Sequence, residues 1–196
     1  MAATALVVAV SSCGSSKQAA NADYYNNPRQ ATTPQQQKLE TLEVDRLVSE
    51  ETDKLRAVGT AIDIDEMDAR REALQNGQLE IASLLETSVI ALTQAYAQEN
   101  NLNSKKLEDK KRNEFVEFSV AQNISTRPVG PVERFLNADG SYQVYRCVEL
   151  MKPTDEVLGN VYNDLVKEEI IGLDYDKQKF IQDNFDKIKE LREKVK

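Results

Sequence analysis

The chain has 196 residues with 33 acidic and 25 basic side chains, a formal net charge of −8, and no histidine. Because an acidic protein lacks the basic face that neutralises phosphates, this balance excludes nucleic acid from the expected partners. The absence of histidine excludes Ser-His-Asp catalysis and every metal site that needs an imidazole ligand. The length suits one domain with its own hydrophobic core.

The chain opens with an apolar run, residues 2–10, which is followed by Ser11, Ser12, Cys13 and Gly14. This order resembles the lipobox of bacterial lipoproteins, in which an apolar residue and two small residues precede a cysteine that becomes lipidated. The resemblance implies that residues 1–12 are a signal peptide and that Cys13 is the lipidation site.

Two properties of the run affect this interpretation. No basic residue precedes its apolar core, so we expect the true start of the protein to lie upstream of Met1. The run is also shorter than the ~20 apolar residues that a transmembrane helix needs. The alternatives are a buried strand over Ala5–Val10 and a signal or anchor without lipid.

Residues 13–37 are rich in Gly, Ser, Asn, Gln and Pro, and they predict a flexible tether. A strand placed before such a tether would have no partner, which favours the signal peptide over the strand. Gly14 stands where well-studied lipoproteins of the inner membrane carry a retaining aspartate. The resemblance therefore implies attachment to the outer membrane. We expect the domain on the periplasmic side, and the alternative is the cell surface.

An α+β domain is predicted over residues 38–152. Helical spacing of apolar residues predicts a short helix at Lys38–Val48, and a first strand is expected at Leu55–Ile62. The small residues Ala57, Gly59 and Ala61 alternate along this strand, so one of its faces leaves room for another element to approach closely.

A long helix is predicted from Glu66 to about Gln98, with Asp63 or Asp65 as its cap. Gly77 lies inside it. We expect this glycine to destabilise the helix by up to about 1 kcal/mol relative to alanine, or to bend it. The predicted apolar stripe consists of Met67, Leu74, Ile81, Leu84, Leu85, Leu92, Ala95 and Tyr96.

The acids at the start of this helix, Asp63, Asp65, Glu66 and Asp68, include enough oxygen ligands for Ca²⁺. Their spacing does not match an EF-hand loop. Acidic residues are also favoured at a helix N-terminus by the helix dipole, so we expect no metal site here.

A break at Glu99–Ser104 precedes a second helix, which Arg127-Pro128 is expected to end. Its predicted face consists of Leu107, Lys111, Phe115, Phe118, Gln122 and Ser125. The alternative for Phe115–Val120 is a strand. A hairpin then joins Val129–Leu136 to Tyr142–Leu150 through Asn137–Gly140, where Asp-Gly supplies the positive φ angles of a tight turn.

With Cys13 lipidated, Cys147 is the remaining cysteine, so no intramolecular disulfide is expected. It lies in a strand with period-two spacing, where a free cysteine is usually a small, half-buried apolar residue. A catalytic thiol would need a base such as histidine beside it.

Residues 153–196 predict a C-terminal helical extension. Its first helix starts at Pro153–Glu156 and continues on one face with Val157, Leu158, Val161, Leu165 and Val166. The final helix starts near Asp174, with a stripe of Phe180 or Ile181, Phe185, Ile188, Leu191 and Val195. We expect this stripe to pack on the domain, and the alternative is a homo-oligomer through this helix.

Three segments carry a family resemblance: the strand Arg56–Ala61, the helix Met67–Leu74 and the hairpin end Asp139–Tyr145. Between Leu55 and Leu150 the chain resembles small bacterial lipoproteins whose domain is similar to the N-terminal domain of flagellar assembly protein T. The family has no catalytic residues. Its helix has a second alanine one turn beyond Ala73, where this chain has Gly77.

The expected fold is thus α+β, with a small sheet of one strand and a C-terminal hairpin packed against long helices and followed by C-terminal helices. The expected function is that of a lipid-anchored lipoprotein that serves as a non-catalytic binding or scaffold component of an envelope assembly. Its expected partners are the membrane, through acyl chains on Cys13, and an envelope protein or the cell wall, without a cofactor. The alternative is a tethered small-ligand-binding protein or hydrolase.

Overall fold

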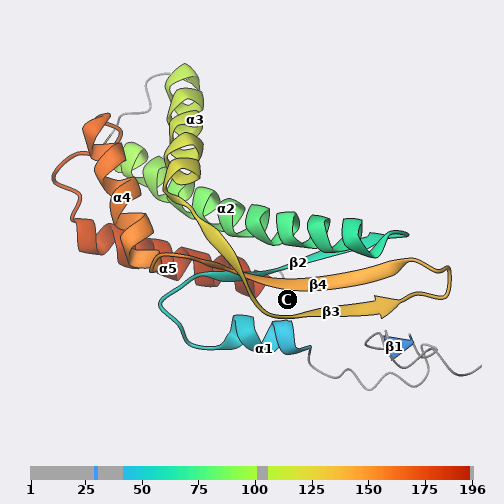
Figure 1. The fold of residues 1–196 in the computed structure, drawn as a ribbon. Helices are drawn as coiled ribbons and strands as arrows, with labels where there is room; N and C mark the ends of the chain where they lie inside the picture. The colour runs from blue at the N-terminus through green and yellow to red at the C-terminus, as the bar shows by residue number, and fades with distance from the viewer. Residues whose placement is uncertain (1–28, 31–41, 101–105, 195–196) are drawn as a thin grey trace, which may run out of the picture.

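The computed structural model describes residues 29–30, 42–100 and 106–194. It confirms the predicted α+β fold. An antiparallel sheet of β2 (Arg56–Asp63), β3 (Thr126–Leu136) and β4 (Tyr142–Leu150) packs against one long helix, α2 (Glu66–Glu99), as Figure 1 shows. The helices α4 (Thr154–Lys167) and α5 (Lys177–Lys194) follow the sheet in the chain.

The strand order is β1-β3-β4-β2. The two-residue strand β1 (Arg29–Gln30) pairs in parallel with the end of β3, at Phe135 and Leu136. It falls within the segment predicted as a tether, where no strand was expected. Cys13 and the remaining residues of that segment lie outside the described residues.

The predicted hairpin between β3 and β4 is confirmed. The Asn137 N–H donates to the Ser141 carbonyl over 2.8 Å, and the Gly140 N–H donates to the Asn137 carbonyl over 3.0 Å. Gly140 alone in this turn has a positive φ, of 87°, so the expectation that Asp139 shares it is wrong. The turn needs one left-handed residue, and glycine takes that position without steric cost.

Strand β3 begins at Thr126, three residues before the predicted start, and it contains Pro128. A bulge interrupts its pairing with β4 between Val129 and Val132, and Gly130 has a φ of 68° there. The preceding helix, α3 (Lys106–Asn123), ends before the Arg127-Pro128 pair that was expected to end it. Pro128 itself pairs with Val148, but among the described strands β1 lies beside β3 only at Phe135 and Leu136. Proline is tolerated here because β3 is an edge strand at this position and needs no N–H donor on its outer side.

The close approach predicted from the small residues of β2 is confirmed on its α2 face. A Cβ at Gly59 would collide with the carbonyl oxygen of Ala73 and the amide nitrogen of Gly77. A Cβ at Gly77 would lie 2.7 Å from Cγ2 of Val148. Gly77 therefore belongs to a backbone contact between helix and sheet, and α2 is one continuous helix through this position.

The predicted apolar stripe of α2 is only partly correct. Ile81, Leu84 and Leu85 are buried as expected, whereas Met67 and Ala95 are exposed. The first half of the helix packs on the sheet through Ala69, Ala73 and Gly77, because larger side chains would separate the two backbones. The prediction followed the large apolar residues and missed this contact.

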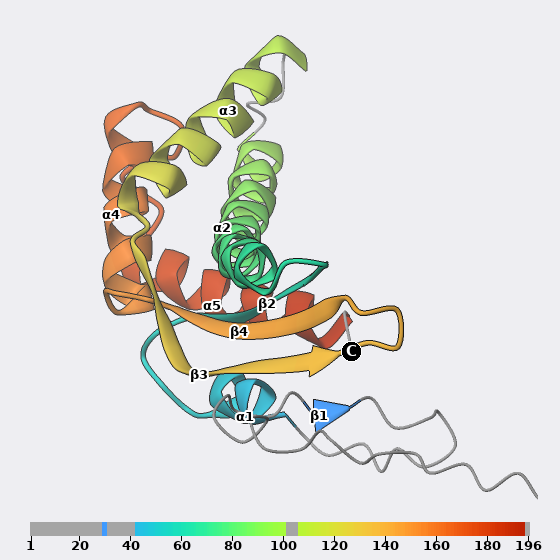
Figure 2. The same cartoon turned by 45° about the vertical axis from the view of Figure 1, so that its right-hand side comes forward.

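The helix interpretation of α3 is confirmed, and its predicted face is correct only at Phe115, which packs against the core. The side chain of Leu107 lies outside the described ones. Lys111, Phe118, Gln122 and Ser125 are exposed, and the buried side consists of Arg112, Val116, Ser119 and Val120. Polar contacts with α4 explain why this side of α3 is buried and not the predicted one. The Ser119 hydroxyl donates to Asp164 over 2.8 Å, and the Asn123 side-chain amide donates to the same carboxylate over 3.0 Å. Figure 2 shows α3 rising away from the sheet beside α4.

Both C-terminal helices contribute to the main core. The predicted face of α4 is confirmed at Val157, Leu158, Val161 and Leu165, which are buried. In α5, Phe180 and Ile188 are buried as predicted, so the expected packing of this helix on the domain is confirmed. Phe185 is exposed and the buried position beside it is Asn184, which corrects the predicted stripe. Val195 lies outside the described residues.

The opposite face of the sheet carries α1 (Glu43–Ser49), so α1 and α2 lie on the two sides of the sheet (Figure 2). Within the predicted Lys38–Val48 helix, the described helix begins at Glu43. Val44 and Leu47 pack on Cys147, which is fully buried rather than half-buried as predicted. The thiol side chain thus serves as a small apolar residue in a second, minor core.

Candidate functional site

The acidic cluster at the junction of β2 and α2 has local structural roles. The Asp65 carboxylate accepts hydrogen bonds from the Met67 N–H over 2.7 Å and the Asp68 N–H over 3.1 Å, which confirms it as the cap of α2. Asp63 accepts a hydrogen bond from the Asp65 N–H over 2.8 Å. Both carboxylates thus satisfy backbone N–H groups that a helix start leaves open.

The other two acids of this cluster form ion pairs. Glu66 pairs with Arg70 on its own helix and with Arg134 of β3, the latter over 2.6 Å. Asp68 pairs with Arg71 over 2.6 Å. Within residues 29–30, 42–100 and 106–194, no group of three or more acidic or cysteine side chains is arranged to hold a metal ion.

Three apolar side chains are exposed at the same junction. Ile62 at the end of β2, Ile64 in the turn and Met67 in the first turn of α2 have exposed fractions of 56%, 83% and 69%. We call these three residues the apolar apex. The sequence contained a signal for it, since Ile64 stands between Asp63 and Asp65 where no strand or helix periodicity requires an apolar residue.

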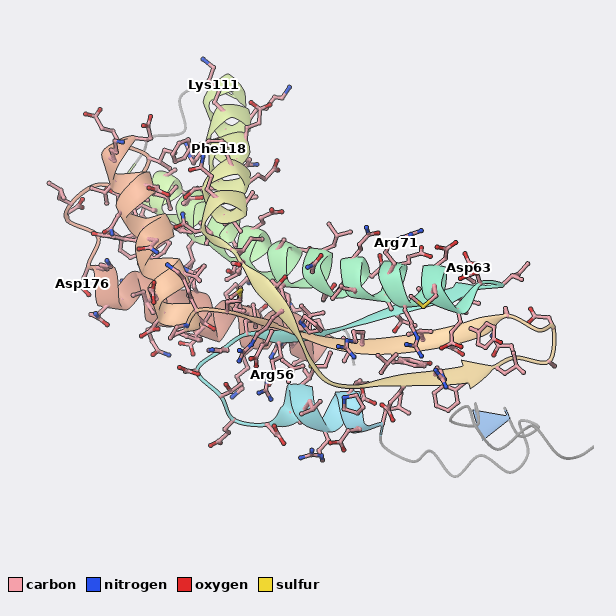
Figure 3. The ribbon with its side chains drawn as sticks, viewed as in Figure 1. Arg56, Asp63, Arg71, Lys111, Phe118 and Asp176 are labelled. Atoms are coloured by element: carbon pink, nitrogen blue, oxygen red, sulfur yellow. The ribbon has the colours of Figure 1, made fainter. Side chains whose placement is uncertain are left out.

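The apolar apex lies at a defined end of the sheet. Asp63 of β2 pairs with Tyr142 of β4, Tyr142 pairs with Leu136 of β3, and Leu136 pairs with Gln30 of β1. These four residues form one row across the sheet. Figure 3 shows Asp63 and Arg71 at this end, with the β3–β4 turn beside them. The N-terminal segment of the chain therefore joins the sheet at the end that carries the apex.

A buried ion pair network lies at the other end of the sheet. The side chain of Glu149 is only 4% exposed and accepts hydrogen bonds from Arg56 over 2.9 Å and from Arg127 over 2.6 Å. Arg56 also donates to the Leu47 carbonyl over 2.8 Å and to Glu50 over 3.0 Å. The network thus connects α1 with all three long strands.

Electrostatics keep Glu149 ionised. Burial by itself raises the pKa of Glu149, but hydrogen bonds from Arg127 and Arg56 outweigh it and hold the pKa below its ordinary value. Burial raises the pKa of the neighbouring Cys147 thiol, which favours the unreactive protonated form. Neither group has the properties of a general acid or a nucleophile at neutral pH.

A tyrosine cluster connects the loop between α4 and α5 with the end of α2 through ring stacking and hydrogen bonds. The rings of Tyr96 and Tyr175 stack with their centroids 5.5 Å apart. The Tyr96 hydroxyl donates to Asp174 over 3.0 Å and accepts from the Gly172 N–H over 2.9 Å. Burial and the hydrogen bond to Asp183 raise the pKa of Tyr175. No local sequence pattern indicates this cluster, because Tyr96 and Tyr175 are about 80 residues apart in the chain.

The described residues thus form an α+β domain in which the buried carboxylate is ion-paired and three apolar side chains project from one end of the sheet. Among these residues no helix combines the length and the apolar character needed to span a membrane. No model of a known protein family matches the chain. No curated protein sequence matches it, and no solved structure does. The resemblance to flagellar-type lipoprotein domains stays a prediction.

Proposed function

We propose that this protein is a lipid-anchored envelope lipoprotein whose domain acts as a non-catalytic binding or scaffold component on the periplasmic side of the outer membrane. The observation that carries the proposal is the order of residues 2–14, in which an apolar run ends in two serines, Cys13 and Gly14. The acyl chains on Cys13 insert into the leaflet, and each buried CH₂ contributes about 0.8 kcal/mol to the attachment.

The use of the charged residues supports a binding role over a catalytic one. Glu149 is held by Arg56 and Arg127, and the acids at the start of α2 are bound by backbone N–H groups or arginines. These groups stabilise the fold and are not poised for proton transfer. The apolar side chains of the apolar apex, in contrast, are exposed to solvent and lie outside the buried core. Exposed apolar residues that lie together mark interaction surfaces.

The test compares the native protein with Cys13→Ser and, as a matched control, with Cys147→Ala. We expect intact-mass measurement to find a mature N-terminus at residue 13 that carries acyl mass. Detergent partitioning should place this protein in the detergent phase. Cys13→Ser should lose the acyl mass and the partitioning, whereas Cys147→Ala should keep both because this cysteine is buried in the domain.

An unmodified Met1, or acyl mass that persists in Cys13→Ser, would overturn the proposal. Either result would remove the anchor and with it the envelope location. Acyl mass on the native protein would direct the search for the partner to envelope proteins and the cell wall.

A further inference from the structure

The apolar apex exposes three large apolar side chains within a six-residue stretch, Ile62 to Met67. Moving exposed apolar side chains from water into an apolar environment, such as a protein partner or a lipid bilayer, is favourable. Three side chains cover far less than the ~800 Å² that each partner contributes to a standard protein interface. They suffice to enter the headgroup and acyl-chain boundary of a bilayer when another group already anchors the protein.

The position of the N-terminal segment brings the bilayer within reach of the apolar apex. Gln30 lies in the same row of the sheet as Asp63, three strand spacings away, which is about 14 Å. Cys13 is 16 residues before Arg29, and an extended chain of that length spans at most about 55 Å. An anchor on Cys13 can therefore hold this end of the sheet against the leaflet.

The charges around the apolar apex are compatible with contact with lipid. Glu66 and Asp68 are paired with arginines, and the Asp65 carboxylate accepts two backbone N–H groups. A paired or hydrogen-bonded carboxylate costs less to bring near an apolar phase than a free one. Ile64, the most exposed of the three apolar residues, lies at the centre of the turn between β2 and α2.

From this arrangement we infer that Ile62, Ile64 and Met67 insert into the surface of the bilayer that holds the acyl chains of Cys13. The end of the sheet that carries the apolar apex then faces the membrane. The inference rests on the proposed function, because the lipid anchor supplies the affinity and the apolar apex supplies the orientation. In this orientation α3 and the loop between α4 and α5 face away from the membrane, toward the envelope partner.

The sequence contains no tryptophan, so one introduced indole reports from a single place. The test uses the lipidated full-length protein with Ile64→Trp, reconstituted in vesicles of phosphatidylethanolamine and phosphatidylglycerol that carry brominated acyl chains. The matched control is Leu173→Trp. Leu173 is 86% exposed and follows Gly172, which binds Tyr96. Tyr96 is 29 residues along α2 from Met67, about 43 Å away.

We expect the emission of the indole at position 64 to shift to the blue and to lose most of its intensity to bromine quenching. The indole at position 173 should keep the emission of a water-exposed residue. Tryptophan itself prefers membrane interfaces, and this preference acts equally in both variants because they carry the same indole on the same anchored protein. A difference between the two positions therefore reports the orientation of the domain.

Flotation of the vesicles in a density gradient separates the two proposals. If the protein floats and the indole at position 64 behaves like the one at position 173, the orientation is wrong and the anchor stands. If both indoles are quenched equally, the domain has no preferred end and the inference is overturned. If the native protein carries no acyl mass and does not float, the proposed function fails and the orientation fails with it.

Discussion

Gly59 allows the backbones of β2 and α2 to touch. A side chain at this position would run into the Ala73 carbonyl and the Gly77 amide, and neither backbone group can move without shifting the helix. Interiors packed this closely tolerate added volume poorly. The neighbouring residues Ala69 and Ala73 are small for the same reason, since they lie on the same side of α2.

We predict that Gly59→Ala lowers the free energy of unfolding by about 3 kcal/mol, because the added methyl group must push α2 away from the sheet. The matched control is Gly159→Ala in α4, where the new Cβ would meet the flexible side chain of Lys177 at 3.1 Å. This control should be neutral or stabilise by up to about 1 kcal/mol, since alanine is the better helix residue. Urea unfolding of both variants measures the difference, and equal midpoints would contradict the prediction.

Glu149 shows how one residue depends on its charged neighbours. Its carboxylate lies between Arg56 and Arg127, and it is the buried acid among the described residues. Removing one partner from a buried ion pair leaves the other charge without compensation. The position is therefore sensitive to substitution and to pH.

We predict that Glu149→Gln lowers the free energy of unfolding at pH 7 by about 3 kcal/mol. The folded-state pKa of Glu149 lies below its unfolded value, so its stabilisation is complete above the ordinary glutamate pKa of about 4.3. It is lost as the pH falls through the lowered folded-state pKa. The gap between wild type and variant should therefore shrink in acid. The exposed Glu72→Gln serves as the control and should change stability by less than about 0.5 kcal/mol at every pH.

At the scale of the element, α5 shows that the position of a side chain on a helix matters more than its type. Phe180 and Phe185 are identical residues separated by five positions, yet the first is fully buried and the second is exposed. Phe180 contacts the rings of Tyr162 and Tyr175, with centroid distances of 5.4 Å and 5.9 Å. The helix thus joins the core along Phe180, Asn184 and Ile188.

We predict that Phe180→Ala lowers the free energy of unfolding by about 3–5 kcal/mol, because it opens a cavity in the core. Phe185→Ala should cost less than about 1 kcal/mol, since its ring keeps contact with water. Thermal unfolding of the two variants compares the same chemical change at two positions of one helix. A larger effect at Phe185 would show that α5 presents a different face to the domain.

The sequence of each element predicted its type better than its orientation. The span of α2, its Asp65 cap and the β3–β4 turn follow from interactions between near neighbours in the chain, so they could be predicted. The buried face of α3 could not, because two stripes of its sequence have helical spacing. Asp164 of α4, some 40 residues away, binds Ser119 and Asn123 and thereby selects one of them.

At the scale of the whole molecule, the segments that the sequence divides into a domain and a C-terminal extension share one hydrophobic core. Leu55 and Val148 of the sheet region, Leu85 of α2, Leu158 of α4 and Phe180 of α5 belong to the same buried cluster. Arg192 of α5 also donates a hydrogen bond to the Arg56 carbonyl on the free edge of β2. The C-terminal helices therefore stabilise the sheet directly.

We predict that deletion of residues 177–196 removes the slow hydrogen exchange of the β2 and β4 amides, because the exposed core no longer supports the sheet. The full chain should unfold in one cooperative transition, with sheet and helix amides protected to a similar extent. Hydrogen exchange followed by mass spectrometry measures both. Retained protection of β2 and β4 in the shortened chain would mean that the sheet and α2 form a stable unit without α5.

The sequence by itself determined the long strands and the helices of this protein, its acidic character, the lipobox-like order around Cys13 and the small residues where β2 meets α2. These properties depend on composition and on residues a few positions apart. Only the tertiary structure decided which face of α3 is buried, that Glu149 lies between two arginines and that Ile62, Ile64 and Met67 are exposed at one end of the sheet. The buried face of α3 and the pairing of Glu149 depend on segments distant in the chain, and local spacing contains no information about which distant segment supplies the contact. The exposure of the three apolar residues depends on how the rest of the described chain packs around their turn.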